Sequence, residues 1–398
     1  MGQDYVLKPD RVFDGIDIHN GWVVAITGNI ISYAGPEKQF SSGQVISLKG
    51  KTVMPGMIEG HGHMFLYPYN ETSWNDQVLK ESIAYRTARA TVHAKETLMA
   101  GFTTVRDLGS EGAGYADVGL KKAINDGVIP GPRLIISTKA IVATGSYGPK
   151  GFADHVNVPL GAEEADGIDD LTKVVRNQIG MGADFIKVYA DYRYGPSGEA
   201  RPTFSQQELE LIVDIAESSG RYVVAHASTA EGMKRAILAG VETIEHGDEG
   251  TDEIWKLMKD KGVAFCPTLA AGDAILQYNG WKKGIDEDPQ RIINKKESFK
   301  RALENGVKIV AGGDVGVFRH GDNSRELILM VEYGMSQLQT LRSVTSSNAD
   351  IFHLPDLGRI SLGKLADIIA VDGNPVEDIS VLKHVSLVMK DGVVVKKD

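Results

Sequence analysis

Two histidines one residue apart, His61 and His63, end an apolar run that begins at Val53. In a β-strand, side chains two residues apart point to the same side, so both imidazoles would leave the strand end together. Imidazole nitrogens are common ligands of transition metals. The pair therefore indicates a metal site, although two unrelated polar residues at the end of a strand would give the same pattern.

More polar residues end strand-like runs later in the chain, and these are Lys187, His226, His246 and Asp314. The carboxyl ends of parallel strands meet on one side of a barrel, so these side chains would converge there. Imidazole and carboxylate together suit zinc, and manganese, iron or cobalt could replace it. We therefore expect four histidines, one aspartate and one lysine around a metal centre.

Lys187 lies inside an otherwise apolar run that continues through Val188. An unpaired ammonium group there would be costly to remove from water. A salt bridge to a neighbouring acid would offset that cost. Alternatively, the neutral amine can react with carbon dioxide to give a carbamate, whose two oxygens can bridge two metal ions.

The middle of the chain alternates strand-like and helical segments, with helices expected at residues 206–218 and 230–238 among others. Eight strand-like runs end at His61, at Asp107, near Ile141, at Lys187, at His226, at His246, near Pro267 and at Asp314. Apolar strands separated by helices favour a parallel sheet buried on both faces. Eight such units predict an α/β fold of the (β/α)8 TIM-like barrel type. The alternative, an open doubly wound sheet, would carry a Gly-rich phosphate-binding turn that this sequence lacks.

The two ends of the chain have a different pattern from the middle. Residues 1–55 and 351–398 hold short apolar runs between turn residues, which is typical of β-structure. Neither end is large enough to bury a core alone, so we predict that they pair. The predicted domains are a small β-sandwich built from 1–55 and 351–398, and a barrel over 56–350.

Composition narrows the class of protein. The chain has 398 residues, 42% of them hydrophobic, and a net charge of −10 without a dense basic patch, which argues against a nucleic-acid partner. It contains no run of eighteen apolar residues and no secretory signal pattern, so we expect no membrane span and no secretion. The single cysteine, Cys266, excludes an internal disulfide and fits a reducing, cytoplasmic compartment.

Together these motifs resemble the amidohydrolase superfamily, in its imidazolonepropionase-like branch, which includes Xaa-Pro dipeptidases and related metallo-carboxypeptidases. Residues 55–63 match the family's first-strand motif, and Lys187 matches the strand-four lysine that is carboxylated in binuclear members. His226 and His246 match the ligands of strands five and six, and Asp314 matches the strand-eight aspartate. Residues 363–371 resemble the signature of the C-terminal β-domain, so the resemblance covers essentially the whole chain.

The resemblance implies two divalent metal ions, with zinc as the expected metal. It places the ligands in two groups: His61, His63 and Asp314 around the more buried ion, and His226 and His246 around the more exposed one. A carbamate on Lys187 and a hydroxide would bridge the ions. Asp314 would take the hydroxide proton as general base and deliver it to the leaving nitrogen as general acid.

The implied reaction is hydrolysis of an amide bond in a small molecule, as in a dipeptidase, a prolidase or an N-acyl amino acid hydrolase. Imidazolonepropionase itself uses one metal and lacks the strand-four lysine, so Lys187 argues against that activity. A cyclic amide or an ester-like substrate on the same centre is the alternative within enzymes. A non-catalytic metal-binding barrel is the alternative outside them, and the complete ligand set with Asp314 argues against it. Barrel enzymes of this kind often self-associate, so a homo-oligomer is compatible with the sequence.

Substrate contacts are expected in the loops that follow the strands. The dipeptidase relatives hold the substrate carboxylate with a histidine after strand three and a tyrosine after the strand-five histidine, whereas this chain has Tyr147 and Ser228 in those loops. Lys150 could add a charge. Further candidate contacts, each of which could instead be a turn or loop residue, are Tyr192, Arg193 and His320, and residues 146–168 form a candidate lid.

Overall fold

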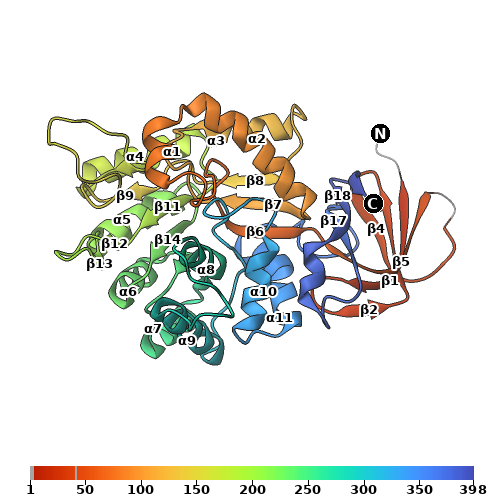
Figure 1. Cartoon of the computed structure of the whole chain (residues 1–398). Coiled ribbons are helices and arrows are strands. Elements are labelled where there is room, and N and C mark those ends of the chain that lie inside the picture. Colours follow the sequence, from red (N-terminus) through yellow and green to blue (C-terminus); the bar gives the residue numbers. More distant parts are fainter. Residues whose placement is uncertain (1–3, 41–42) are drawn as a thin grey trace.

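A computed structural model, which describes residues 4–40 and 43–398, shows a mixed α/β protein with two β-rich regions side by side (Figure 1). In the larger region, short parallel strands are surrounded by helices. The smaller region holds a sheet of longer strands, and both ends of the chain lie in it.

The sheet of the smaller region combines both ends of the chain, as predicted. Its eight strands are β1 (Tyr5–Phe13), β2 (Ile18–Asn20), β3 (Trp22–Thr27), β4 (Ile30–Pro36), β5 (Gln44–Pro55), β17 (Ile368–Asp372), β18 (Val385–Lys390) and β19 (Val393–Lys397). The strand order is β19-β18-β17-β5-β1-β3-β4, with β2 on β1. The antiparallel pair β5–β17 joins the two ends of the chain. Buried side chains from both ends, including Leu7, Val53 and Leu387, form one hydrophobic cluster there.

The larger region contains two parallel sheets. One has the order β6 (Met57–Gly62), β7 (Phe102–Asp107), β8 (Arg133–Ile136), and the other has the order β10 (Glu163–Glu164), β9 (Ile141–Val142), β11 (Ile186–Tyr189), β14 (Val223–Ala227), β15 (Thr243–His246), β16 (Ala264–Cys266). Nearly all of these strand residues are buried, which explains why the strands appear as apolar runs in the sequence. The third predicted strand is therefore divided between β8 and β9.

The eighth predicted strand, residues 307–311, is irregular. Instead of a continuous ladder, it forms a single parallel bridge from Ile309 to Phe265 of β16, and Val315, four residues beyond its end, forms another to Gly62 of β6. Close approach to β6 explains the glycines that follow, because a Cβ atom at Gly312 would lie 2.5 Å from the backbone nitrogen of His61. This segment therefore contacts both sheets although it is not itself a regular strand.

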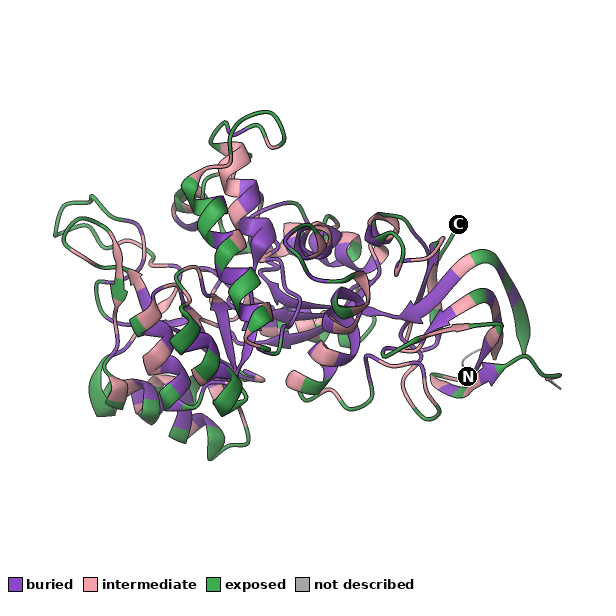
Figure 2. Cartoon of the chain, turned by 90° about the horizontal axis from the view of Figure 1, so that it is seen from below, coloured by how far each residue is buried: buried purple, intermediate pink, exposed green. Residues whose placement is uncertain are grey.

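Helices cover the strands of the larger region, and their inner faces are buried while their outer faces are exposed (Figure 2). They are α1 (Trp74–Lys80), α2 (Ile83–Met99), α3 (Ala116–Asn125), α4 (Gly167–Met181), α5 (Gln206–Glu217), α6 (Ala230–Ala239), α7 (Asp252–Lys261), α8 (Leu269–Tyr278), α9 (Gln290–Glu304), α10 (Ser324–Glu332), α11 (Gln337–Arg342) and α12 (Asn348–Ile351). Both helices named from the sequence are present, and a capping box of Ser205 and Glu208 begins α5. No described helix has the length and apolar character needed to cross a membrane.

The side chain of Asn348 joins the irregular eighth segment to β6. It is fully buried, and its amide nitrogen donates to the carbonyls of Ile58, at 2.7 Å, and Ala311, at 2.8 Å. Its amide oxygen accepts from the backbone nitrogen of Ala311 at 3.1 Å. A side chain thus supplies hydrogen bonds where a regular strand ladder is missing.

Replacing Asn348 by alanine should therefore lower the free energy of unfolding by about 2–4 kcal/mol, because three buried backbone groups lose a partner. Urea unfolding followed by circular dichroism measures this change. The exposed Asn29→Ala variant is the control and should stay within about 0.5 kcal/mol of the parent protein. An Asn348→Ala variant as stable as the control would show that these hydrogen bonds do not stabilise the protein.

Candidate metal centre

A cavity of about 480 Å³ lies at the carboxyl ends of the parallel strands. Five of the predicted metal ligands line it, and these are His61, His63, His226, His246 and Asp314. They come from β6 and the residue that follows it, from β14 and β15, and from the segment after residue 311. The parallel arrangement of these strands brings together residues that are up to 253 positions apart, from His61 to Asp314.

Three of these side chains form a compact group. The Oδ1 atom of Asp314 lies 3.3 Å from Nε2 of His63 and 3.7 Å from Nε2 of His61. The potential ligand atoms of all three residues lie within 4.8 Å of one another. Asp314 has a φ of 63°, a left-handed conformation that is uncommon outside glycine and is often found at functional sites.

His226 and His246 extend this group along the cavity. Their ring centroids are 4.4 Å apart, and the ring of His246 is 5.1 Å from that of His61. His246 also has a left-handed backbone, with a φ of 77°, and its Nδ1 lies 2.8 Å from the Thr268 hydroxyl. The four imidazoles thus form one continuous cluster from β6 to β14.

Burial makes most of these imidazoles neutral. It lowers the pKa of His61 to about 4 and that of His226 to about 3, and it holds the pKa of His246 well below its usual value. Burial also acts on His63, but the hydrogen bond and charge of Asp314 outweigh it and raise the pKa to about 9. Neutral imidazole is the form that binds metals, so three of the four rings are already in the ligating state at neutral pH.

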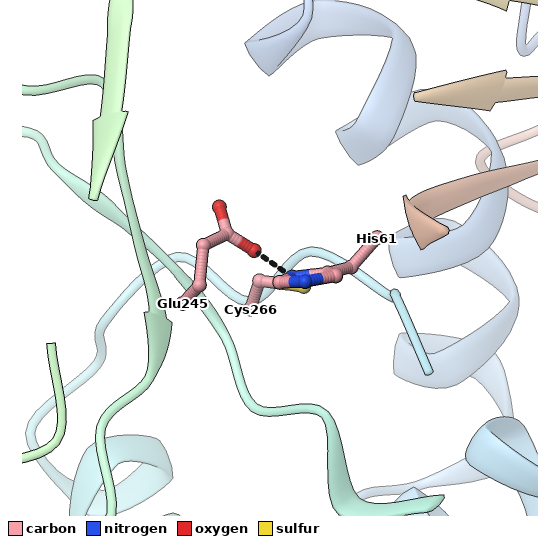
Figure 3. Close-up of side chains that lie close together, drawn as sticks. All are labelled: His61, Glu245 and Cys266. Atoms are coloured by element: carbon pink, nitrogen blue, oxygen red, sulfur yellow. Dashed lines mark hydrogen bonds and ion pairs between the residues drawn. The ribbon is translucent and has the colours of Figure 1, made fainter. Parts of the chain in front are cut away.

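The orientation of His61 is set by a buried carboxylate (Figure 3). Its Nδ1 lies 2.8 Å from Oε2 of Glu245, and the other oxygen of Glu245 accepts from Arg106 at 2.8 Å. The charge of Arg106 and the bond to His61 outweigh burial and hold the pKa of Glu245 well below its usual value, so Glu245 is a carboxylate. A carboxylate can only accept, so Nδ1 of His61 carries the hydrogen and Nε2 is left free toward Asp314.

His63 is oriented in the same way, because its Nδ1 lies 2.9 Å from the carbonyl of Gly109. Cys266 lies beside His61 and Glu245 in Figure 3, and the donor atoms of these three residues are also close together. Burial raises the pKa of the Cys266 thiol, and its sulfur lies 3.7 Å from the carbonyl of Gly312. The thiol therefore stays protonated and packs beside His61.

Lys187 on β11 is 1% exposed. Burial lowers its pKa to about 8, against the opposing charges of Glu245 and Asp314. Its ammonium has neither a hydrogen bond nor an ion pair with any residue in the described part of the chain, and its Nζ is 5.4 Å from the Tyr189 ring centroid. The structure therefore does not contain the salt bridge considered as one way to stabilise this lysine.

The predicted substrate contacts divide into two groups. Tyr147, Tyr192, Arg193 and Ser228 line the cavity. His320 does not line it, because its buried ring stacks on His93 with centroids 4.2 Å apart, behind the loop after β6. Lys150 is exposed and bonds the carbonyl of Gly145. The structure thus places these last two outside the cavity.

The candidate lid is partly regular structure. Residues 150–157 form an exposed loop, but the segment then continues into β10 and the start of α4.

Two acidic residues at the site, Glu245 and Glu111, were not predicted from the sequence. Glu245 lies in a buried apolar strand, and the desolvation argument applied to Lys187 would have singled it out. Glu111 lines the cavity, but its place in a loop after β7 carries no comparable signal.

Comparisons with known proteins show which proteins this chain is similar to. The model of the amidohydrolase family matches residues 52–395. Ochratoxinase from Aspergillus niger is 31% identical over 420 aligned residues, which cover 96% of this chain and 84% of the relative. A crystal structure of a Xaa-Pro dipeptidase with bound methionine in the active site is 33% identical, with a TM-score of 0.88 over 99% of this chain and 100% of that one. A prolidase complexed with N-methylphosphonate-L-proline is 30% identical, with a TM-score of 0.88 and the same coverage.

The Glu245→Gln variant should lose about 3 kcal/mol of unfolding free energy at neutral pH, because it leaves the buried Arg106 guanidinium without its counter-charge. Glu245 has a depressed pKa in the folded state, so its stabilisation is complete above its ordinary value of 4.5 and is lost as the pH falls below that value. The gap in unfolding free energy between the parent protein and the variant should therefore be constant above about pH 6 and should narrow as the pH falls.

Denaturant unfolding at a series of pH values measures this gap. The exposed Glu217→Gln variant is the control and should track the parent protein throughout. A gap that is absent, or that widens as the pH falls, would contradict the assignment of Glu245 as a buried carboxylate.

Proposed function

This chain belongs to the amidohydrolase family, and we propose that it uses two divalent metal ions to hydrolyse the amide bond of a dipeptide or an N-acyl amino acid. Its membership and its relatives make it a hydrolase of amide carbon–nitrogen bonds. The observation that carries the metal proposal is the convergence of four imidazoles and Asp314 on one cavity, with Lys187 buried on a neighbouring strand and without an ion pair to any described residue.

The donor set fits two ions, and zinc suits its mixture of imidazole and carboxylate. His61, His63 and Asp314 would hold the first ion, since their ligand atoms are already close together. His226 and His246 would hold the second. When bound, the ions would lower the pKa of a water molecule and polarise the scissile carbonyl.

We propose that Lys187 is a carbamate in the active protein. Its neutral amine would attack carbon dioxide, forming a carbon–nitrogen bond and releasing one proton. Two observations support this: burial lowers the lysine pKa to about 8, and no described residue pairs with the ammonium. Two carbamate oxygens would then be available to both groups of histidines.

Asp314 is the proposed general base and then general acid. Burial would raise its pKa, but a hydrogen bond from His63 and the positive charge of that imidazole lower it overall. Asp314 is thus a carboxylate that can accept a proton from the attacking water and deliver it to the leaving nitrogen.

The size of the cavity and the relatives of this chain support the proposed substrate class. A volume of about 480 Å³ is within the range of small-molecule sites. One related structure is a Xaa-Pro dipeptidase and another is a prolidase. The test is a panel of Xaa-Pro dipeptides, other dipeptides and N-acyl amino acids, with cyclic amides and esters beside them. Release of free amino acids is the expected result, and turnover of only cyclic amides or esters would overturn the proposed substrate class.

We further propose that the two parallel sheets are arcs of one closed (β/α)8 barrel over residues 56–350. Hydrogen bonds at both gaps support closure. On one side, the backbone nitrogen of Val310 donates to the carbonyl of Phe265, and that of Gly60 donates to the carbonyl of Ala311. On the other side, the backbone nitrogen of Asp184 donates to the carbonyl of Ile136. Residues 1–55 and 351–398 would form the separate β-sandwich domain, which the shared hydrophobic cluster of the chain ends supports.

The Asp314→Asn variant should retain most of the bound metal but lose at least about a hundredfold in kcat, because the amide cannot accept a proton. Metal content by mass spectrometry and steady-state kinetics on the best substrate of the panel measure both quantities. The exposed Asp260→Asn variant is the control. Unchanged turnover in Asp314→Asn would remove this residue from the proton transfers.

The Lys187→Ala variant should lose the metal pair, so metal content should fall from about two ions per chain to one or fewer. Substituting the exposed Lys300 by alanine is the matched control, which should keep the full metal content. Circular dichroism checks that both variants are folded. A fully occupied binuclear centre in folded Lys187→Ala would refute the carbamate.

A further inference from the structure

A second group of side chains lies in the same cavity, beside the candidate metal centre. It consists of Glu111 and four tyrosines, Tyr69, Tyr147, Tyr189 and Tyr192, and is called the Glu111 subsite below. The ring of Tyr189 stacks on that of His226 with centroids 4.5 Å apart, so the subsite adjoins the proposed metal ligands. The proposed mechanism gives Glu111 no role.

Glu111 is held firmly in an unusual conformation. Its φ is 47°, a left-handed value that costs free energy for a residue with a side chain. One carboxylate oxygen, Oε2, accepts from Nε1 of Trp74 and from the hydroxyl of Tyr147, both at 2.8 Å. The other oxygen, Oε1, is buried and has no hydrogen-bond partner in the described part of the chain. A buried carboxylate with one unused oxygen has capacity for a further donor.

The charge of Glu111 is not neutralised by an ion pair with any described residue. The positive charge of Arg86, which lies behind it, acts on Glu111, but the guanidinium gives its hydrogen bonds to the carbonyl of Phe65 at 3.1 and 3.2 Å and not to the carboxylate. The negative charge of Glu111 also acts on the tyrosines. Burial first, and Glu111 second, raise the pKa of Tyr147 and of Tyr189 well above the usual value, so these phenols stay protonated.

The tyrosine rings gather around one another next to this carboxylate. The ring centroid of Tyr147 is 4.9 Å from that of Tyr189 and 4.9 Å from that of Tyr192, in tilted and edge-on arrangements. Aromatic faces carry partial negative charge and attract organic cations. Phenol rings beside a carboxylate that has no ion pair with any described residue therefore favour a positively charged group and disfavour a second carboxylate.

We propose that the Glu111 subsite binds an organic cation, a protonated or quaternary amine, and so selects substrates that carry a positive charge close to the scissile amide. The selection of charged substrates rests on the proposed function, whereas the binding of the cation does not. The Tyr147 hydroxyl donates to Glu111, and a substrate carboxylate placed next to Glu111 would meet a like charge.

Binding is tested without turnover by titrating the metal-loaded protein with choline in a calorimeter. Its uncharged carbon isostere, dimethylbutanol, is the matched ligand, and a quaternary amine has no lone pair with which to bind a metal. Choline should bind at least about tenfold more tightly than dimethylbutanol. Glu111→Gln should lose this preference, while Tyr147→Phe, which keeps the carboxylate and the ring, should retain it.

Two results would overturn the proposal: equal binding of choline and dimethylbutanol, or an undiminished preference for choline in folded Glu111→Gln. The second result would mean that Glu111 only holds Trp74 and Tyr147 in place.

A kinetic experiment compares alanine p-nitroanilide with lactic acid p-nitroanilide, which replaces the ammonium by a hydroxyl. The parent protein should favour the ammonium substrate, and Glu111→Gln should raise KM for that substrate more than it lowers kcat. Choline selectivity without any amide hydrolysis would leave the subsite standing and count against the proposed function alone.

Discussion

Charge buried at the carboxyl ends of the parallel strands is the constraint on which the rest of this structure depends. Glu245 and Arg106 are both fully buried, and each is tolerated only because the other neutralises it. Their pairing in turn fixes His61, whose free nitrogen faces Asp314. Lys187 is buried close to these groups, and no residue in the described part of the chain pairs with it in this way. A lysine in that state is poorly explained as a structural residue, and a reaction that changes its charge resolves the conflict.

The fold supplies the precision that such a site needs. His61, Lys187, His226 and His246 lie on short strands in which nearly every residue is buried, so their backbones have little freedom. Where the ladder fails, at the eighth segment, the side chain of Asn348 restores hydrogen bonding between that segment and β6. The carboxylate of Asp314 is thereby held next to both histidines of the first strand, although its own backbone is in an unfavourable conformation.

Much of this arrangement could be predicted from the sequence, because parallel strands covered by helices leave a simple pattern of apolar runs with polar ends. That pattern located the six proposed ligands and the pairing of the chain ends. It missed the irregular eighth strand, since an apolar run carries no information on whether its ladder is continuous. It also placed His320 among the substrate contacts, whereas packing against His93 holds it behind the loop. Glu111 was missed because its importance comes from Trp74 and Tyr147, which are distant in sequence.

The central claim is that these residues hold a pair of metal ions, and anomalous X-ray diffraction of crystals grown with zinc tests it most directly. The account predicts two anomalous peaks in the cavity, one beside His61, His63 and Asp314 and the other beside His226 and His246. It also predicts electron density for a carboxylated Lys187 between them. A single peak, or two peaks with an unmodified Lys187 ammonium, would contradict the binuclear centre as described.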